Sequence, residues 1–234
     1  MKRIPSRELL DDDAGTPVEV AGTLADIQFF NHHFGGVPTT MRMIERVARA
    51  SGRSSFSMLE VAAGTGDLPR SVGTGLDQGG IGLEVTLLDR CAGHMRDGGK
   101  KVAGDALALP FPDSSFDLIS CCLFVHHLAP AEVTAFVKEA LRCSCVAVLI
   151  NDLVRHPVHL AAAYAGRLIY RSRLTRNDAP ASVRQAYTTR EMRGLLERSG
   201  AARTEIARHY FYRMGAIAWK GLFPEAHALS SERH

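Results

Sequence analysis

Short apolar runs that alternate with helical stretches are the feature that most constrains the fold of this chain. Strands are predicted over residues 56–61, 83–88, 101–103, 116–125 and 145–151, and several of them are apolar almost throughout. Strands of this kind are buried on both faces, which is typical of a parallel sheet covered by helices. We expect an α/β fold, with a Rossmann-like, mostly parallel seven-stranded sheet and helices on both faces.

The two ends of the chain predict additions to this sheet. Residues 21–34 and 37–50 carry apolar residues at helical spacing on either side of Gly35-Gly36, so we expect a helical cap over residues 1–52. Residues 203–220 are typical of a β-hairpin with its bend at 213–215. We expect all 234 residues to form a single domain.

Residues 153–188, here called the lid segment, fit neither pattern. An apolar helix is predicted over 159–170 and a basic loop over 171–178, followed by a helix over 189–199 that leads to the hairpin. An insertion at this point would lie over the carboxyl edge of the sheet, where open α/β folds bind their ligands. The lid segment is therefore expected to cover a binding site.

Charge and cysteine usage narrow the partners and the compartment. The formal net charge is only +3 and the basic residues are scattered, so we expect no nucleic-acid partner. No apolar run approaches the roughly 20 residues of a membrane span, and no apolar stretch of a secretory signal follows the first residues. The five cysteines lack the spacing of a zinc knuckle, and we expect them reduced in a cytoplasmic protein without a metal. The oligomeric state stays open.

A glycine-containing turn follows the first predicted strand. Gly64-Thr65-Gly66 lets the backbone approach a ligand, and the helix predicted to start at Asp67 presents free N–H groups to it. Ala62 stands where a dinucleotide fingerprint would have its first glycine. The acidic Asp67 beside the turn suits a cationic ligand better than a pyrophosphate.

Three acidic residues mark successive strands: Glu60, Asp89 and Asp105. This constellation resembles the class I S-adenosylmethionine (SAM)-dependent methyltransferases, in the group that acts on small molecules and has His-His at the fourth strand. The resemblance implies that residues 59–67 wrap the methionine part of SAM, that Asp89 accepts from the ribose hydroxyls and that Asp105 accepts from the adenine amino group. The implied cofactor-binding residues are Glu60, Ala62, Gly64, Thr65, Gly66, Asp67, Asp89, Arg90, Asp105, Ala106 and Cys122. S-adenosylhomocysteine (SAH) would be the product.

Candidate bases for methyl transfer follow the fourth and fifth predicted strands. His126-His127 ends the fourth, and Asn151-Asp152 ends the fifth. Histidine titrates near neutrality and is a suitable proton acceptor, while a nearby carboxylate stabilises its protonated form. The resemblance implies that His126 and Asp152 act on an acceptor hydroxyl, and His127 is the third candidate catalytic residue.

A looser resemblance concerns the acceptor. Residues 173–187 and 31–36 are similar to segments of bacterial methyltransferases associated with polyketide and phenolic-lipid enzymes, which implies secondary metabolism. With the apolar lid helix, this favours an aromatic or alkyl-bearing acceptor. The candidate acceptor residues are Asn31, His33, His156, Tyr164, Ser182 and Tyr187.

The leading hypothesis is O-methylation of a small phenolic, quinol or polyketide-like molecule with His126 as general base. C-methylation of a quinone precursor is the second, because a nucleophilic carbon needs a strong base less. A SAM-binding regulatory protein without catalysis is the third. The sequence leaves the acceptor and the methylated atom open.

Overall fold

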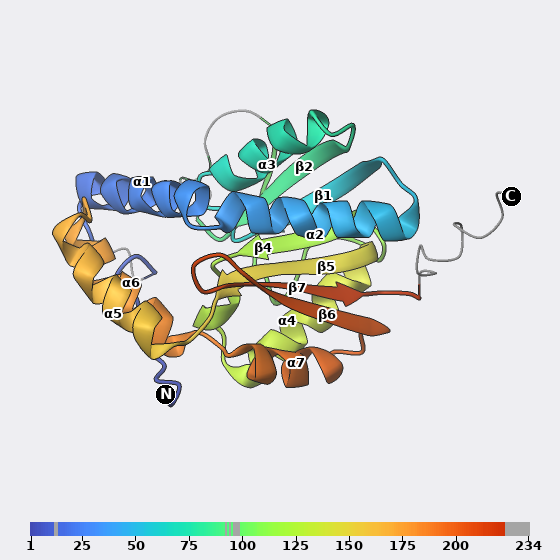
Figure 1. Ribbon diagram of the computed structural model, residues 1–234. Helices are drawn as coiled ribbons and strands as arrows, with labels where there is room; N and C mark the ends of the chain where they lie inside the picture. The colour runs from blue at the N-terminus through green and yellow to red at the C-terminus, as the bar shows by residue number, and fades with distance from the viewer. Residues whose placement is uncertain (12–13, 92, 94, 96–98, 223–234) are drawn as a thin grey trace, which may run out of the picture.

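A single seven-stranded sheet forms the centre of the molecule (Figure 1). The computed structural model describes residues 1–11, 14–91, 93, 95 and 99–222. The strands are β1 (Ser55–Val61), β2 (Gly82–Asp89), β3 (Lys100–Ala103), β4 (Phe116–Cys122), β5 (Ser144–Leu153), β6 (Arg203–His209) and β7 (Arg213–Trp219). Their order is β3-β2-β1-β4-β5-β7-β6, and β7 alone among these strands runs antiparallel to the others. The predicted fold class is confirmed.

The central strands are buried because helices cover both faces of the sheet. The helices are α1 (Pro17–His33), α2 (Gly36–Ser51), α3 (Asp67–Asp77), α4 (Pro130–Cys143), α5 (Pro157–Ala165), α6 (Arg173–Gln185) and α7 (Thr189–Glu197). Figure 1 shows α2 and α3 on one side of the sheet, α4 and α7 on the other, and α1, α5 and α6 gathered at one end. Two apolar cores result, one containing Ile44 and Val72, the other Phe136 and Leu195.

The pairing of β1, β2, β4 and β5 places the ends of these strands, where the candidate site residues lie, at one edge of the sheet. Val61 of β1 pairs with Leu88 of β2 and with Cys121 of β4, and Cys122 pairs with Asn151 of β5. Since these strands are parallel, the segments that follow each of them meet at the same carboxyl edge. That edge faces α1, α5 and α6.

Several boundaries near the carboxyl edge differ from the sequence-based predictions. The fourth strand ends at Cys122 rather than 125, because Leu123 takes a positive φ of 54° and a 3₁₀ helix, η2 (Val125–His127), follows. The hairpin turns at 210–212, and not at 213–215. The apolar lid helix stops at Ala165 and continues as a 3₁₀ helix, η3 (Gly166–Leu168).

The basic loop predicted over 171–178 is wrong, because most of it is the start of α6. Ser172 caps this helix by accepting a hydrogen bond from the N–H of Leu174. Leu174, Ala181 and Val183 are all buried, so packing covers more than one side of the helix. The sequence of residues 91–97 also favours a helix, but most of that stretch lies outside the described residues.

Residues 1–11, here called the N-terminal strap, pack along α6. The N–H groups of Leu9 and Leu10 donate to the two carboxylate oxygens of Asp178, at 2.9 and 3.1 Å, and Ile4 donates to the carbonyl of Arg184. Arg3 reaches further and donates to the carbonyl of His126. The strap thereby joins α6 to the end of β4.

Two general properties follow from the described part of the chain. None of its helices is both long and apolar enough to cross a bilayer. The five cysteines are all free thiols.

Replacing Phe136 by alanine should lower the free energy of unfolding by about 3–5 kcal/mol, since the ring is fully buried and packs edge-on against Phe124. Phe29, which is 39% exposed, gives the matched control, and Phe29→Ala should cost no more than about 1 kcal/mol. Urea unfolding followed by the fluorescence of Trp219, the single tryptophan, measures both. Equal losses in the two variants would contradict the assignment of the core.

Candidate active site

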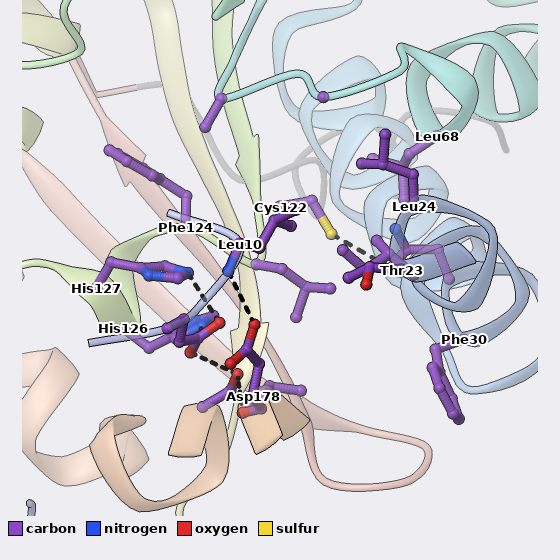
Figure 2. Close-up of a pocket in the computed structure, with 18 of the residues that line it drawn as sticks. Leu10, Thr23, Leu24, Phe30, Leu68, Cys122, Phe124, His126, His127 and Asp178 are labelled. Atoms are coloured by element: carbon purple, nitrogen blue, oxygen red, sulfur yellow. Dashed lines mark hydrogen bonds and ion pairs between the residues drawn. The ribbon is translucent and has the colours of Figure 1, made fainter. Parts of the chain in front are cut away.

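A cavity of about 850 Å³ opens at the carboxyl edge of the sheet (Figure 2). Its walls come from α1, the turn after β1, the ends of β2 and β4, the lid segment and the N-terminal strap. The volume lies in the upper part of the range of about 300–1,000 Å³ that is usual for small-molecule sites. The cavity is large enough for a cofactor and an acceptor side by side.

The turn after β1 forms one wall of the cavity. Ala62, Gly64 and Gly66 all have positive φ, at 54°, 51° and 75°. A Cβ on Gly64 would meet no atom within 4 Å, whereas one on Gly66 would lie 2.6 Å from the side chain of Leu87. Gly64 therefore leaves room for a ligand, and Gly66 allows close packing on β2. Ala62 adopts the left-handed conformation at a cost of roughly 1–2 kcal/mol, so the missing first glycine does not prevent the turn.

Asp89 and Asp105 line the adjoining wall. The carboxylate of Asp89 accepts from the N–H groups of Gly64 at 2.8 Å and Cys91 at 2.9 Å, and that of Asp105 accepts from Leu107 at 2.9 Å. Carboxylate oxygens have further lone pairs, so both groups can still accept from a ligand. Arg90 and Ala106 follow them along the same wall.

Thr65 and Asp67 stabilise the turn from within. The hydroxyl of Thr65 donates to Asp67 at 2.7 Å, and Arg70 donates to the other carboxylate oxygen at 3.0 Å. Both Thr65 and Asp67 also line the cavity, whereas Gly66 does not. Gly66 therefore serves the turn and makes no direct contribution to the cavity wall.

Glu60 places a carboxylate in the cavity wall, and one oxygen of that carboxylate has no hydrogen-bond partner among the described residues. The residue is 2% exposed, and the oxygen without a partner is Oε2. Burial raises the pKa of Glu60 to about 7. The carboxyl also has a hydrogen bond with Ser120, so only one of its oxygens lacks a partner. A buried carboxylate oxygen without a partner is costly, and a cationic ligand relieves that cost. The ammonium and sulfonium groups of SAM fit this requirement.

Arg213 supplies an opposite charge in the same region and was not anticipated from the sequence. It lines the cavity and is 2% exposed, and no described carboxylate pairs with it. Its guanidinium donates to the side-chain oxygen of Asn31 at 2.8 Å and to the Sγ atom of Cys122 at 3.5 Å. A carboxylate on the bound ligand suits such a cation. Arg213 follows the hairpin turn, and no motif in the sequence marks it as a binding residue.

The predicted catalytic pair is assembled at the end of β4. His126 Nδ1 lies 2.7 Å from Asp152, whose second oxygen accepts the backbone N–H of His126 at 3.0 Å. Both residues are buried, and His126 lines the cavity with Asp152 behind it. This contact directs the Nδ1 proton to Asp152 and leaves Nε2 facing the cavity.

Glu8 of the N-terminal strap faces that Nε2 atom at 3.6 Å and was also missed. Burial lowers the pKa of His126, but Asp152 and Glu8 outweigh burial and raise it to about 10. The same ion pairs outweigh burial and hold the pKa values of Glu8 and Asp152 below their usual range. Its neighbour His127 binds Asp11 through Nδ1 at 2.8 Å. No motif marks Glu8, because only the tertiary fold brings the strap to η2.

Two of the predicted acceptor residues line the cavity. Asn31 is held by Arg213, and the hydroxyl of Ser182 donates to Glu8 at 2.6 Å. The lining also contains apolar side chains that the sequence did not single out: Leu10, Leu24, Ile27, Phe30, Ile169 and Phe211.

The other four predicted acceptor residues lie outside the cavity lining. His33 stacks on Phe29, and His156 caps α5 by accepting from the N–H of Val158. Tyr164 bonds Arg184 at the surface, and Tyr187 donates to the carbonyl of Leu128. Each is engaged by local packing, so we revise their placement to the surroundings of the site.

Replacing Glu60 by glutamine should weaken SAM binding by about 10- to 100-fold, because it removes a charge-assisted contact. In the unaltered chain, SAM affinity should rise between about pH 6 and pH 7.5, since the ligand favours the ionised form of a carboxyl whose pKa is about 7. Glu60→Gln should flatten this rise. Calorimetric titration with SAM at several pH values measures both effects.

Glu84→Gln, on the exposed part of β2, is the matched control. An unchanged pH profile in Glu60→Gln would exclude Glu60 as the contact.

Residues 59–145 match the protein family described as a methyltransferase domain. The demethylmenaquinone methyltransferase of Roseiflexus castenholzii (strain DSM 13941 / HLO8) is 40% identical over 104 residues, which make up 43% of this chain and 43% of that protein. The match thus spans less than half the length of this curated relative.

Solved structures with the same fold cover more of the chain. The plantazolicin methyltransferase BpumL, in complex with SAH, has a TM-score of 0.65 at 11% identity, over 92% of this chain and 95% of that chain. A SAM-dependent methyltransferase from Aquifex aeolicus has a TM-score of 0.54 at 14% identity, over 77% and 88%. At these identities the likeness shows the fold.

The family match falls on the strands and turns that build the cofactor side of the cavity. The sheet order, the open space at Gly64 and the unpaired carboxylate of Glu60 agree with a cationic nucleoside ligand there. The chain therefore has the class I methyltransferase fold, its residues 59–145 match a methyltransferase domain, and SAM is the cofactor.

Proposed function

We propose that this chain O-methylates a small phenolic, quinol or polyketide-like acceptor, with His126 as the proton acceptor. The observation that carries the proposal is the buried contact between His126 and Asp152 in the cavity wall, at 2.7 Å. This contact fixes the orientation of the imidazole through Nδ1 and leaves Nε2 available to a hydroxyl group. SAM, when bound, supplies an electrophilic methyl group that is transferred by in-line displacement.

The residues of the chain then have distinct tasks. With SAM bound, its methyl group would be supplied to the acceptor oxygen, and Nε2 of His126 would receive the hydroxyl proton. Asp152 stabilises the resulting imidazolium without taking the proton. The apolar cavity walls exclude water and hold the acceptor in line.

Glu8 controls when His126 can accept a proton. Its carboxylate faces Nε2 and, together with Asp152, keeps the imidazole protonated. An acceptor hydroxyl that enters between Glu8 and His126 separates this pair and takes the place of the carboxylate. His126 then keeps Asp152 as its partner and becomes a stronger acid, so it can pass its Nε2 proton to the displaced Glu8 carboxylate before the transfer.

The surroundings of the site support a small, partly apolar acceptor. Phe30, Ile169 and Phe211 lie on the side of the cavity formed by α1, the lid segment and the hairpin turn. The formal charge of +3 gives no concentrated basic face for a nucleic acid. An aromatic ring with an alkyl substituent matches such a wall.

A second candidate is C-methylation of a quinone precursor. The printed name of the Roseiflexus castenholzii relative, demethylmenaquinone methyltransferase, favours it, although the match covers 43% of that protein. A nucleophilic ring carbon needs less help from a base, so this reaction depends less on His126. A regulatory protein that binds SAM without catalysis is the third candidate.

The first experiment follows the methyl group. Methyl-labelled SAM is incubated with the protein and lysate of the source organism, and the organic extract is separated from the macromolecules. Label in the organic phase supports the proposal and supplies the product, whose methylated atom distinguishes O- from C-transfer. Label confined to protein or RNA would overturn the small-molecule assignment. No transfer in any fraction would favour the regulatory candidate.

His126→Ala should lower the rate of O-transfer by about 10²- to 10⁴-fold, since it removes the proton acceptor. SAM affinity should change little, because the carboxylates of the cofactor wall remain. Label transfer and calorimetric SAM binding are measured on the same preparation, with His209→Gln, in β6, as the matched control. Retention of most activity in His126→Ala would exclude it as the base and favour C-methylation.

A further inference from the structure

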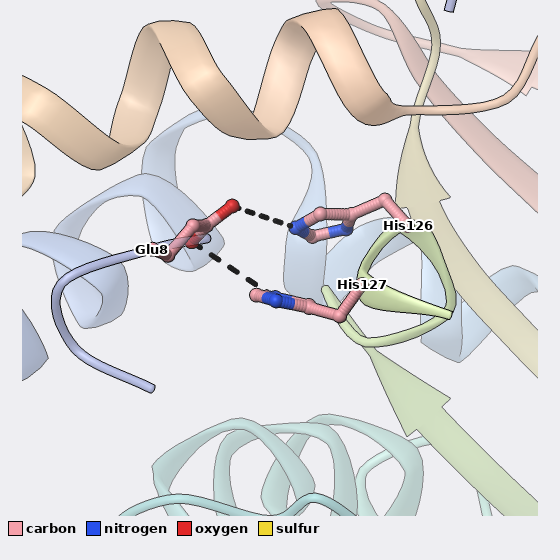
Figure 3. Close-up of side chains that lie close together, drawn as sticks. All are labelled: Glu8, His126 and His127. Atoms are coloured by element: carbon pink, nitrogen blue, oxygen red, sulfur yellow. Dashed lines mark ion pairs between the residues drawn. The ribbon is translucent and has the colours of Figure 1, made fainter. Parts of the chain in front are cut away.

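Two histidines and a glutamate converge at the acceptor side of the cavity. Among the described residues, Glu8, His126 and His127 each offer a ligand atom, and these atoms lie within 4.8 Å of one another. Figure 3 shows both rings directed at the Glu8 carboxylate, with Nε2 of His126 at 3.6 Å and Nε2 of His127 at 3.9 Å from its oxygens. Ligand atoms around a tetrahedral Zn²⁺ lie about 3.3 Å apart, as bonds of about 2.0–2.1 Å require. Small side-chain rotations bring the three atoms to one ion.

Each imidazole is oriented by a carboxylate on its other nitrogen. Asp152 binds Nδ1 of His126 at 2.7 Å, and Asp11 binds Nδ1 of His127 at 2.8 Å. With the Nδ1 protons directed to these carboxylates, both Nε2 atoms point toward Glu8. A bound metal ion would displace the proton that Nε2 of His126 carries toward Glu8 in its absence. Histidines that ligate metals are held in this way, because the carboxylate fixes the tautomer and increases the basicity of the ligand.

The glutamate is oriented as well. Its Oε1 atom accepts from the hydroxyl of Ser182 at 2.6 Å and from the side-chain amide of Gln185 at 2.7 Å. Both donors belong to α6, which also holds the N-terminal strap through Asp178. All three candidate ligands therefore have a partner that fixes their direction.

We propose that Glu8, His126 and His127 bind one divalent transition-metal ion of the Zn²⁺ type. Two imidazoles and one carboxylate suit Zn²⁺ and its neighbours in the first transition row, whereas Mg²⁺ and Ca²⁺ prefer oxygen ligands alone. Two further carboxylates, Asp152 and Asp11, lie directly behind the rings and offset the positive charge of the ion. Since the three ligands line the cavity, the remaining coordination position faces it and is open to water or to an oxygen of a ligand.

This inference goes beyond the proposed function. A metal ion and the acceptor proton use the same lone pair on Nε2 of His126, so the metal-bound chain is a different state from the one that accepts a proton. The two proposals also fail separately, because metal binding is measured without SAM or acceptor.

The test is a titration of the full-length, untagged and chelator-treated protein with Co²⁺ alone, followed by its visible d–d absorption. A saturable band that Zn²⁺ displaces is expected. His127→Gln should abolish the band, because it removes a ligand. Asp11→Asn should weaken Co²⁺ binding by roughly 10-fold, because it removes only the carboxylate behind His127.

His209→Gln provides the matched control, since that histidine lies in β6, away from the cavity lining, and its loss should leave the titration unchanged. Asp11 has an exposed side chain, so Asp11→Asn keeps the test decisive even if His127→Gln disturbs folding. Absence of a saturable band would overturn the proposal. So would a band whose strength and midpoint are the same in Asp11→Asn and in the unaltered chain.

Discussion

The buried contact between His126 and Asp152 joins the two strand ends on which the candidate chemistry depends. Asp152, on β5, receives both the ring Nδ1–H and the backbone N–H of His126. The turn after β4 therefore cannot move away from β5 without leaving a buried carboxylate unpaired. Removal of one partner from a buried ion pair costs about 3–5 kcal/mol. The imidazole is thus held in the cavity wall before any ligand arrives, which is the condition for efficient proton transfer.

The cavity concentrates ionisable groups that are rarely buried together. The half-buried Asp89 accepts from two backbone N–H groups, and the buried Glu8 accepts from Ser182 and Gln185. Glu60 and Arg213 differ, because neither has a partner of opposite charge among the described residues. A zwitterionic amino-acid group carries both charges that these two residues lack. Its binding would offset the cost of burying each of them, which explains why such unfavourable positions persist at the cofactor side.

Most of the fold and the cofactor side could be predicted from the sequence, because the signals there are local. Apolar strands, the turn Gly64-Thr65-Gly66 and the acids at successive strand ends each lie within a few residues of the structure they form. Asp89 reaches the turn because parallel strands place it there, as the order of elements predicts. The contact of His126 with Asp152 follows from the same rule.

The acceptor side could not be predicted, because tertiary contacts determine it. The segment 171–178 is polar and basic and precedes Pro180, which is typical of a loop, yet packing of Leu174 and its neighbours makes it helical. Glu8 lies 118 residues before His126 and has no motif, so only the packing of the N-terminal strap on α6 brings them together. His156, in turn, is a plausible ligand by type, but it caps α5.

The separation between the cofactor side and the acceptor side also determines which residues the family match covers. The family match covers residues 59–145, which include Glu60, Asp89, Asp105 and the two histidines of η2. Asp152, Glu8 and the apolar residues of α1 and α6 all lie outside it. The cofactor side of the cavity therefore lies mostly within the family match, whereas the acceptor wall is built mostly by segments outside it. In the proposed function, the acceptor hydroxyl would enter between Glu8 and His126, which the N-terminal strap and α6 hold together. The contacts of Asp178, Ser182 and Gln185, rather than the sheet, would then limit the space open to that hydroxyl.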